Sequence, residues 1–458
     1  MADILQAPQL NDIPLLVEQA LEIASETPRV VRIEIPIPPI DPLAWLQAQQ
    51  ASVKTYWADR DGSFTMAGVG AADTVSGKDR LPPYASLFRR LRAGLSCARP
   101  NLRYYGGMRF DPRRMADSRW TRWGAYWFVI PRFEVLTTSA GSFLVCNALS
   151  ANGHEDHKEV AAIRHELGTI ALGPCERRGN VPGVLTRNMR PDREQWSKMV
   201  ERALAAFEKG VLEKVVLARE CSFEFADAPD ALAILSRLAA AVGDAYLFMF
   251  QPGEGAAFLG ASPERLYRRV GGFIQSEALA GTRPRGVSDK ADDALADVLL
   301  HDNKELREHR FVVDGIRDAF EVLCKDIRGD REVSIVRLRD CQHLIRRFEG
   351  ILADGKSVPD ILEALHPTPA VGGCPTQAAL EWIAKEESFD RGWFAGPVGW
   401  VGYDSSEFAV GIRSGLIDRK THSLYAGAGI VSGSDAEREW TEIDNKLETF
   451  ASVLTKDI

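Results

Sequence analysis

The stretch GASPERLYRRVGGFIQSEALAGTRPRG, residues 260–286, has the clearest structural pattern in this chain. Leu266–Val270 and Phe273–Leu279 carry the apolar and aromatic residues that are typical of strands. Gly271-Gly272 between them is a two-residue turn of the kind that joins antiparallel strands. The stretch is therefore predicted to be a β-hairpin.

Both ends of this hairpin carry charged residues that a simple hairpin does not require. Glu264 precedes the first strand, and the second strand ends in a glycine-flanked turn with Arg283 and Arg285. A carboxylate that faces clustered arginines on rigid strands would form a pocket for a small anion. A surface hairpin with charged ends accounts for the same residues, so the local sequence leaves both interpretations open.

The composition is that of a globular protein with a sizeable core: 458 residues, of which 45% are hydrophobic and 26% charged. The net charge of −8 disfavours a general nucleic-acid-binding protein. No apolar run is long enough to span a bilayer, and the N-terminal residues lack the pattern of a secretory signal. Seven cysteines without paired spacing predict reduced thiols, a cytoplasmic protein and no zinc site.

The first half of the chain is predicted to be rich in strands and shows no chemical motif. Residues 172–192 have poor periodicity and are the best candidate for a linker. We divide the chain into 1–190 and 191–458, which together are expected to form one compact unit. Strands are expected at 30–37, 54–57, 63–68, 102–108, 123–136 and 142–147, and helices at 11–26, 41–49, 85–96 and 153–170.

A buried strand is predicted at Lys214–Arg219, KVVLAR, directly after an amphipathic helix over 192–209. Its apolar core is unbroken, which indicates a strand that is covered on both faces. Lys214 stands where this strand begins. A lysine at such a position is usually solvated, but burial disfavours the charged form of an amine, which could then act as a general base.

The helix predicted after Asp302 gives the sharpest inference from the residues alone. An apolar stripe from Val312 to Leu323 marks its core-facing side. Extending this stripe backwards by one turn places Glu308, and then Glu305, on the same buried face. Asp302 and Glu305 also resemble a capping box, which would explain Glu305 but not Glu308. Two acids on an inward face repel each other unless a cation neutralises them.

A second pair of acids lies on the helix predicted at the C-terminus. The pattern Ser-x-x-Glu at 434–437 resembles a capping box, and an apolar stripe follows over 440–454. Glu439, Glu442 and Lys446 lie beside this stripe, where a solvated charged strip is the alternative explanation. Two helices that each offer carboxylates three residues apart suggest one divalent cation between them, and ligands that are all oxygen favour Mg²⁺ or Mn²⁺ over Zn²⁺.

Two predicted strands near the C-terminus have features of an anion-binding site. Val410–Arg413 is expected to be a strand that ends in an arginine, and Tyr425–Ile430 a strand whose glycines let a ligand approach the backbone. The N–H groups of Gly427 and Gly429 would suit a carboxylate. Arg413 would hold it in a bidentate fork.

Nine motifs follow one another along the second half of the chain: KVVLAR (214–219), GASPE (260–264), EALAGTR (277–283), KELREH (304–309), QHL (342–344), HPTPAV (366–371), SFDR (388–391), GIR (411–413) and YAGAGI (425–430). In this order they resemble the chorismate-utilising enzymes, and most closely the isochorismate synthases. The likeness is dense over 190–455. In the first half it is looser, where DPLAW (41–45) and Tyr56-Trp57 are similar to the long form associated with menaquinone and phylloquinone synthesis.

The resemblance implies a fold and a reaction. The fold is α+β, with two large, mainly antiparallel sheets flanked by helices, and region 191–458 would bind chorismate and carry catalysis. Lys214 matches the general base that activates water for attack at C2 of chorismate. Glu264 matches the general acid that protonates the departing C4 hydroxyl, and the product would be isochorismate.

The resemblance also implies the ligand contacts. A Mg²⁺ site that clamps the ring carboxylate is matched by Glu305, Glu308, Glu439 and Glu442. The resemblance does not show which of these bind the metal directly and which bind it through water. The enolpyruvyl carboxylate would be held by Arg413 and the backbone of the glycine-containing strand. The substrate-binding positions that the resemblance implies are Thr282, His343, Arg413, Ala426, Gly427, Gly429 and Lys446.

Single residues distinguish the reactions within this family. Relatives that add ammonia carry glutamine where Lys214 stands, and aminodeoxychorismate synthases often carry lysine where Ala280 stands, so water is the expected nucleophile. Salicylate synthases go on to eliminate pyruvate and often carry tyrosine where Phe394 stands; a chorismate-binding protein without turnover is the third alternative. The resemblance implies a monomer, and it leaves open whether the product feeds quinones, a siderophore or salicylate.

Overall fold

The structure is a computed structural model that describes residues 10–23, 30–78, 80–150, 154–172, 179–339 and 341–455. The expectation about a secretory signal falls mainly on residues 1–9, and the end of the helix predicted over 11–26 on residues 24–26, both outside these ranges. Within the described ranges, no helix combines the length and the apolar character needed to cross a bilayer. In the described part of the chain, Cys97, Cys146, Cys221, Cys324 and Cys374 are free thiols.

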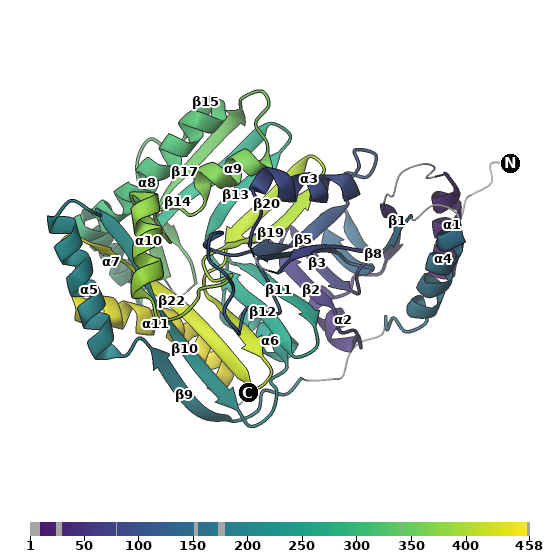
Figure 1. Ribbon diagram of the computed structural model, residues 1–458, viewed down its shortest axis with the longest axis horizontal. Coiled ribbons are helices and arrows are strands. Elements are labelled where there is room, and N and C mark those ends of the chain that lie inside the picture. The colour runs from purple at the N-terminus through teal and green to yellow at the C-terminus, as the bar shows by residue number, and fades with distance from the viewer. Residues whose placement is uncertain are drawn as a thin grey trace.

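A twelve-stranded antiparallel sheet runs along the molecule (Figure 1). Its strands are β1 (Val30–Ile37), β2 (Lys54–Ala58), β3 (Phe64–Val69), β7 (Phe133–Thr138), β8 (Gly141–Leu149), β9 (Val184–Arg190), β10 (Lys214–Phe225), β11 (Tyr246–Gly253), β12 (Ala256–Ser262), β18 (Gly373–Cys374), β21 (Ser414–Asp418) and β22 (Thr421–Val431). Their order is β1-β8-β7-β3-β2-β11-β12-β21-β22-β10-β18, and β9 pairs with the C-terminal half of β10.

A ten-stranded antiparallel sheet forms the second layer. Its strands are β4 (Asp73–Gly77), β5 (Arg103–Met108), β6 (Tyr126–Ile130), β13 (Arg265–Val270), β14 (Phe273–Pro284), β15 (Cys324–Gly329), β16 (Ser334–Arg337), β17 (Cys341–Leu352), β19 (Pro397–Gly402) and β20 (Ser405–Val410). Their order is β15-β17-β14-β13-β20-β19-β5-β6-β4, with β16 beside β17. The predicted hairpin is confirmed as β13 and β14, although β14 continues beyond the predicted end at Leu279 to Pro284.

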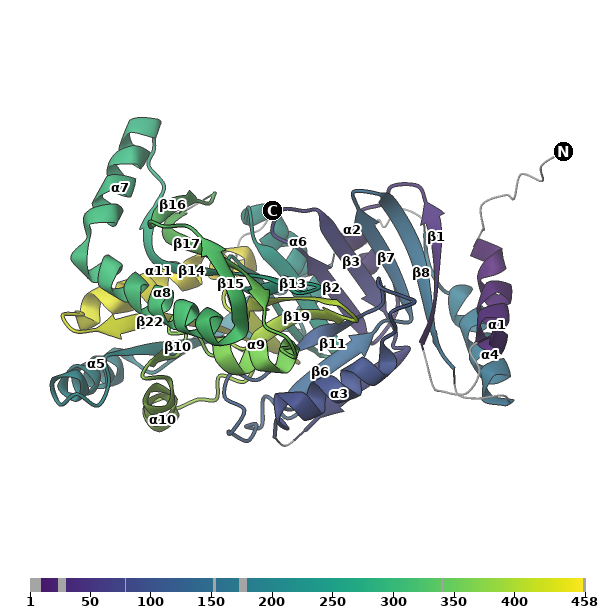
Figure 2. The same ribbon diagram turned by 90° about the horizontal axis from the view of Figure 1, so that it is seen from above.

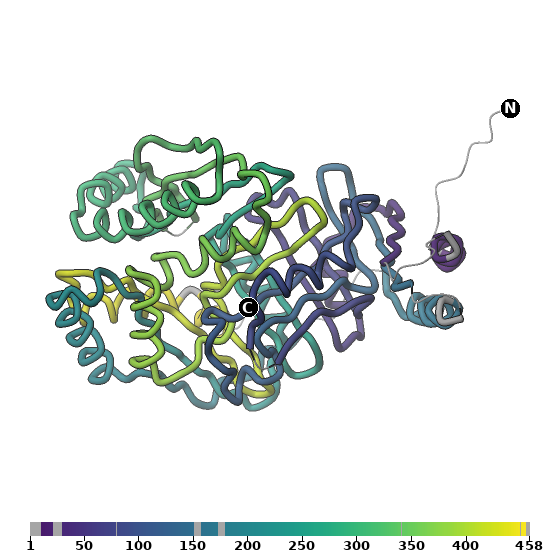
Figure 3. Tube along the Cα trace, turned by 45° about the horizontal axis from the view of Figure 1, so that its top comes forward, coloured from purple at the N-terminus to yellow at the C-terminus, as the bar shows by residue number. Residues whose placement is uncertain are grey.

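Helices cover the sheets and extend the molecule at both ends (Figure 2). They are α1 (Ile13–Ile23), α2 (Pro42–Ala48), α3 (Tyr84–Gly94), α4 (His154–Leu167), α5 (Arg193–Glu208), α6 (Ala231–Ala241), α7 (Asp289–His301), α8 (Asn303–Leu323), α9 (Val358–Leu365), α10 (Thr376–Glu386) and α11 (Ala436–Thr455), and a short 3₁₀ turn, Leu10–Asp12, precedes α1. Figure 3 shows α1 and α4 side by side beyond β1, while α5 and α11 lie at the opposite end.

The two sheets pack face to face through large aromatic and charged side chains. The ring of Phe64 on β3 lies 6.1 Å from that of Trp400 on β19. The hydroxyl of Tyr246 on β11 donates a hydrogen bond to Glu407 Oε1 on β20 at 2.8 Å. Because buried polar groups need partners, these contacts fix how the sheets lie on each other. Two large antiparallel sheets flanked by helices confirm the predicted fold class.

Each sheet combines strands from both halves of the chain, and the two blocks of strands meet at one junction in each sheet order. β2 pairs with β11 in the larger sheet, and β5 pairs with β19 in the smaller one. Part of the predicted linker, 172–192, is strand β9, which pairs with β10; its residues 173–178 lie outside the described ranges. The first half therefore supplies neighbouring strands to the second half within both layers.

The single strand predicted over 123–136 is wrong. The chain forms β6 and β7 there, and these belong to different sheets. Pro131 stands between them and has no N–H group to continue a ladder. Arg132 N–H instead donates to Val69 O of β3 at 3.1 Å, which directs the chain into the larger sheet.

Candidate active site

Helix α8 presents two carboxylates near its N-terminus. Asp302 is the N-cap, and its side chain accepts hydrogen bonds from the N–H groups of Lys304 at 3.0 Å and Glu305 at 3.2 Å. Glu305 and Glu308 are both buried and continue the apolar stripe of the helix, as the spacing predicted. The Glu305 carboxylate lies 3.3 Å from Arg283 Nη1, so its contact is made across the site rather than with its own helix start.

Helix α11 presents the second pair of carboxylates. Its first turn is capped by Asp435, whose Oδ1 accepts from the Arg438 N–H at 3.0 Å. Ser434 Oγ instead accepts from the N–H at the end of β22, so the predicted cap at Ser434 is wrong by one residue. Glu439 is buried, while the Glu442 side chain is 30% exposed.

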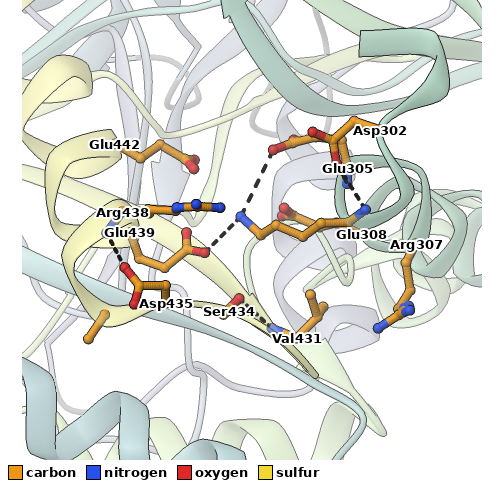
Figure 4. Close-up of polar contacts among 12 residues, drawn as sticks. Asp302, Glu305, Arg307, Glu308, Val431, Ser434, Asp435, Arg438, Glu439 and Glu442 are labelled. Atoms are coloured by element: carbon orange, nitrogen blue, oxygen red, sulfur yellow. Dashed lines mark hydrogen bonds and ion pairs between the residues drawn. The ribbon is translucent and has the colours of Figure 1, made fainter. Parts of the chain in front are cut away.

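The two pairs of carboxylates face each other between α8 and α11 (Figure 4). We call Glu305, Glu308, Glu439 and Glu442 the four-glutamate cluster. An ammonium group joins its two sides: Lys304 Nζ lies 2.7 Å from Glu439 Oε1 and 3.9 Å from Glu305 Oε1. The cluster is therefore bridged by a cation that the protein itself supplies.

Other cations contact single members of the cluster. Lys446 Nζ lies 2.6 Å from Glu442 Oε1, one helical turn away. Lys214 Nζ lies 3.2 Å from Glu308 Oε1, across from β10 to α8. Each carboxylate thus has a cationic neighbour, but none of these contacts is a bidentate fork.

The proton affinities of the cluster reflect its burial. Burial raises the pKa of Glu439 to about 7, with Lys304 opposing the shift and the charge of Glu442 adding to it. Burial, followed by the charge of Glu308, raises the pKa of Glu305. Burial opposes ionisation of Glu442 as well, but the neighbouring cations Lys446, Lys304 and Arg283 together outweigh it and lower the pKa of that carboxyl. Helix α11 therefore carries one carboxyl that gains a proton readily, Glu439, and one that does not, Glu442.

The ligand chemistry of this cluster fits a divalent cation, although its carboxylates are not preassembled around one point. In the described residues, no three His, Cys, Asp or Glu side chains are close enough together to hold a metal ion as they stand. Glu439 Oε2 is buried and has no hydrogen-bond partner in the described part of the chain. Carboxylate oxygens are the ligands that Mg²⁺ prefers. A cation held by both helices would compete with Lys304 for Glu439.

Lys214 is the first residue of β10 and is fully buried. It faces Glu308 because Gly429, on the paired strand β22, has no side chain. A Cβ atom at Gly429 would lie 2.0 Å from Glu308 Oε1 and 3.1 Å from Lys214 Cε. The glycine is therefore required for the close approach of this amine and this carboxylate.

Glu264 lies between β12 and β13 and is 5% exposed. Its backbone is fixed on both sides: its N–H donates to Ser262 Oγ at 3.2 Å, and its carbonyl accepts from the Val410 N–H at 3.1 Å. Burial, with the charge of Glu277 adding to it, raises the pKa of Glu264 to about 8, against the opposing charges of Lys214 and Lys446. This carboxyl therefore holds a proton at neutral pH, as a general acid must.

A cavity of about 900 Å³ opens beside these groups. Lys214, Glu264, Glu308 and Glu439 are not among its lining residues, nor are Ala426, Gly427 and Gly429. Pro263, next to Glu264, does line it. The predicted site residues that line the cavity are Thr282, Glu305, His343, Arg413, Glu442 and Lys446.

His343 and Thr282 form a neutral polar pair on the cavity wall. Thr282 Oγ1 lies 3.0 Å and Gly281 O 3.1 Å from His343 Nδ1. Because a carbonyl oxygen only accepts, the latter contact assigns the proton to Nδ1. Burial, followed by the charge of Arg413, lowers the pKa of His343 to about 4, so the ring is uncharged at neutral pH.

Arg413 is not at the end of a strand as predicted. β20 ends at Val410, and Arg413 lies in the connection to β21 with a left-handed φ of 49°. Its Nη1 donates to Lys446 O at 3.4 Å, and Lys446 Nζ donates to Gly427 O at 2.9 Å. Both cations therefore reach the cavity from the side where the two strands and α11 meet.

A family model for chorismate binding enzymes matches residues 16–455, which is nearly the whole chain. The chain belongs to the chorismate-binding enzyme family. The match includes the first half of the chain, where the sequence resemblance was loose, and both carboxylate-bearing helices.

Named relatives in this family cover the chain from end to end. The isochorismate synthase MenF of Bacillus subtilis is 31% identical over 456 residues, 95% of this chain and 96% of its own length. The salicylate biosynthesis isochorismate synthase of Pseudomonas aeruginosa is 33% identical, over 94% of this chain and 91% of its own. The solved structure of the menaquinone-specific isochorismate synthase MenF from Escherichia coli superposes with a TM-score of 0.84 at 31% identity, over 98% of this chain and 100% of that one.

Within this chorismate-binding fold, sequence reasoning missed the contacts of three charged residues close to the site. Lys304 stands in the quoted KELREH motif without a predicted role, and Arg283 was predicted to face Glu264 in an anion pocket rather than to contact the glutamates; both contact Glu305. Arg60, from the first half, reaches the strand next to Glu264 and showed no local signal. The contacts of Arg60 depend on how the two halves pack, which the local sequence does not record.

Proposed function

We propose that this chain is an isochorismate synthase, which adds water at C2 of chorismate and releases the C4 hydroxyl to give isochorismate. The observation that carries the proposal is the presence at one site of a buried carboxyl that keeps its proton, Glu264, and a buried amine, Lys214, which lies 3.2 Å from the carboxylate of Glu308. An allylic exchange of hydroxyl groups needs one of each. The relatives named isochorismate synthase support the same assignment.

The two groups take complementary roles in the proposal. Lys214 takes a proton from the attacking water, and Glu308 at 3.2 Å stabilises the ammonium that forms. Glu264 gives its proton to the departing C4 oxygen, which would otherwise leave as hydroxide. Both side chains are buried, so neither proton exchanges directly with bulk water while the substrate is bound.

The ring carboxylate of chorismate would be bound through Mg²⁺ held by the four-glutamate cluster. When bound, the metal would supply positive charge to orient that carboxylate. Glu305, Glu308, Glu439 and Glu442 are the residues that would hold it. Their oxygen-only chemistry and the unpartnered Glu439 Oε2 support this part of the proposal.

The enolpyruvyl carboxylate would lie against the cationic side of the cavity. Arg413 and Lys446 line that side and offer two positive charges. Thr282 and neutral His343 line the cavity as polar groups without charge, which suits the hydroxyl-bearing ring. We further propose that the enzyme is cytoplasmic and acts as a monomer. The free thiols of Cys97, Cys146, Cys221, Cys324 and Cys374 support the cytoplasmic compartment.

The test is to incubate the purified protein with chorismate and Mg²⁺ and to separate the products by chromatography. The expected result is isochorismate in equilibrium with chorismate, with loss of activity on chelation of the metal. Sustained release of pyruvate and salicylate would instead identify a salicylate synthase. Binding of chorismate without any turnover, with or without metal, would identify a binding protein.

A further inference from the structure

Arg60, at the tip of the β2–β3 hairpin, is the one charged side chain from the first half that we find bonded directly beside Glu264 in the described structure. The hairpin tip has a rigid shape: Asp59 N–H donates to Phe64 O at 3.0 Å, and Gly62 has a left-handed φ of 70°. Asp59 Oδ1 also accepts from the Phe64 N–H at 3.0 Å. The turn therefore aims Arg60 away from its own sheet and toward the strands of the other sheet.

Arg60 binds both the residue before Glu264 and a carboxylate beside it. Its Nη1 donates to Pro263 O at 2.8 Å and to Glu277 Oε1 at 2.5 Å, and its Nη2 donates to Glu277 Oε2 at 3.0 Å. Glu277 is 2% exposed, so the fork is a largely desolvated, charge-assisted pair. Glu277 lies on β14, within the quoted hairpin.

The same carboxylate holds the residue after Glu264. Glu277 Oε1 accepts a hydrogen bond from the Arg265 N–H at 3.3 Å. The backbone groups on both sides of Glu264 are therefore bonded to one pair of side chains, Arg60 and Glu277. We call this arrangement the Glu277 clasp.

A second layer of contacts supports the clasp. The guanidinium of Arg60 lies 5.8 Å from the centre of the Tyr246 ring, and the Tyr246 hydroxyl donates to Glu407. Arg265 Nε donates to the same hydroxyl at 2.8 Å. The clasp thus has little freedom to move, because its parts are bonded to both sheets.

We propose that Arg60 is a positioning residue for the general acid: through the Glu277 clasp, the first half of the chain fixes the Ser262–Arg265 turn and so aims the Glu264 carboxyl at the leaving oxygen. The inference rests on the proposed function for the role of Glu264. Arg60 itself does not line the cavity, so it acts on the reaction through the clasp and not by contact with the substrate. Misplacing a catalytic group by about 1 Å can cost a hundredfold in rate.

The test compares Arg60→Ala with wild type at saturating chorismate and Mg²⁺. The expected result is a fall in kcat of about tenfold to a hundredfold, with the KM for chorismate changed by less than about threefold, because the binding groups are untouched. Added guanidinium ion at millimolar concentration should restore part of the lost kcat by refilling the fork. Arg60→Lys keeps the positive charge but loses the bidentate fork, so its kcat should lie between those of wild type and Arg60→Ala.

The matched control is Arg132→Ala, because Arg132, in the same half of the chain, also binds one glutamate, Glu159, with two guanidinium nitrogens, and it lies near a second, Glu166. Its contacts lie on α4 and β8, away from Glu264. This variant should lower the melting temperature but leave the kcat of the folded enzyme unchanged and unresponsive to guanidinium. If Arg60→Ala behaves in the same way, the positioning role is overturned.

A separate variant distinguishes failure of this inference from failure of the proposed function. Glu264→Gln should abolish most turnover whether or not Arg60 matters. If Glu264→Gln keeps full activity, both the proposed function and the inference fall. If Glu264→Gln is inactive and Arg60→Ala has wild-type kcat, the function stands and the positioning role is wrong. Should Arg60→Ala fail to fold, the same outcomes apply to Arg60→Lys.

Discussion

The Glu277 clasp and the four-glutamate cluster belong to the same site, but their buried carboxylates are paired in different ways. Glu277 is gripped by a guanidinium fork, with every partner supplied by the protein. The cluster holds four glutamates, with single-point contacts to Lys304, Lys446, Lys214 and Arg283. A fully paired carboxylate fixes geometry, whereas a loosely paired set keeps affinity for a further cation. Under the proposed function, this difference separates the part of the site that would position the general acid from the part that would bind the metal ion.

Lys214 offers the most severe test of this contrast, because it lies between the two regions. It forms an ion pair with Glu308, and its charge also acts on Glu264. Lys214→Ala should lower kcat by about a hundredfold or more, the usual scale for loss of a general base. Steady-state kinetics with the melting temperature as control would measure it. A near-normal rate would show that water is activated elsewhere.

Glu305→Gln should weaken metal binding by the four-glutamate cluster without affecting the Glu277 clasp. The substitution removes one negative charge and leaves the side-chain shape, so the affinity for Mg²⁺ should fall by about tenfold to a hundredfold. Isothermal calorimetry with Mg²⁺ gives the affinity, and thermal unfolding without metal gives the stability. If the variant unfolds while its metal affinity stays unchanged, Glu305 is a structural residue of α8 and the contrast is wrong.

The pH dependence of the rate should test the other part of the comparison, which is Glu264 beside the Glu277 clasp. Glu264 must be protonated to act as the acid, and its pKa is raised to about 8 by burial and by Glu277. The rate should therefore fall about tenfold per pH unit above pH 8, where Glu264 loses its proton. The charges that face Glu264 are Glu277, Lys214 and Lys446. A profile of kcat/KM for wild type and Glu264→Gln checks this; a descending limb that begins near pH 6 would contradict it.

Lys304→Met should have the smallest effect and the opposite sign to Glu305→Gln. Removing the ammonium between Glu305 and Glu439 removes a competitor for the metal, so Mg²⁺ or Mn²⁺ should bind up to about fivefold more tightly. Electron paramagnetic resonance of bound Mn²⁺ measures this without turnover. The exposed lysine Lys325, which lies on β15 beyond the far end of α8 and pairs with Asp354, gives the control substitution. Weaker metal binding would show that Lys304 supports the site rather than competing for it.

Local periodicity predicted the parts of the site that lie on single elements. The apolar stripe of α8, extended toward the N-terminus, predicted that Glu305 and Glu308 are buried, because residue spacing alone determines which side chains share a helix face. Lys214 at the start of a buried strand was recognised in the same way. The roles assigned to these residues came from the family resemblance and stay predictions until tested.

The contacts that join distant elements could not be predicted in this way. Arg413 was placed on a strand, but its left-handed φ lies in a connection whose path depends on the neighbouring sheet. The split of 123–136 into β6 and β7 depends on which sheet accepts each strand. Arg60 gave no signal because its partners, Pro263 and Glu277, lie in the other half of the sequence.

The pairing of β2 with β11 has a consequence for how the chain is made. In the twelve-stranded sheet, β2 is the first-half strand that borders the second half, and β11 pairs with its outer edge. β11 leaves the ribosome only after β9 and β10 have been synthesised. Until then a nascent chain exposes the hydrogen-bonding edge of an almost wholly buried strand, a surface that invites association with other chains. Synthesis of this protein should therefore depend on chaperones more than its final stability would suggest.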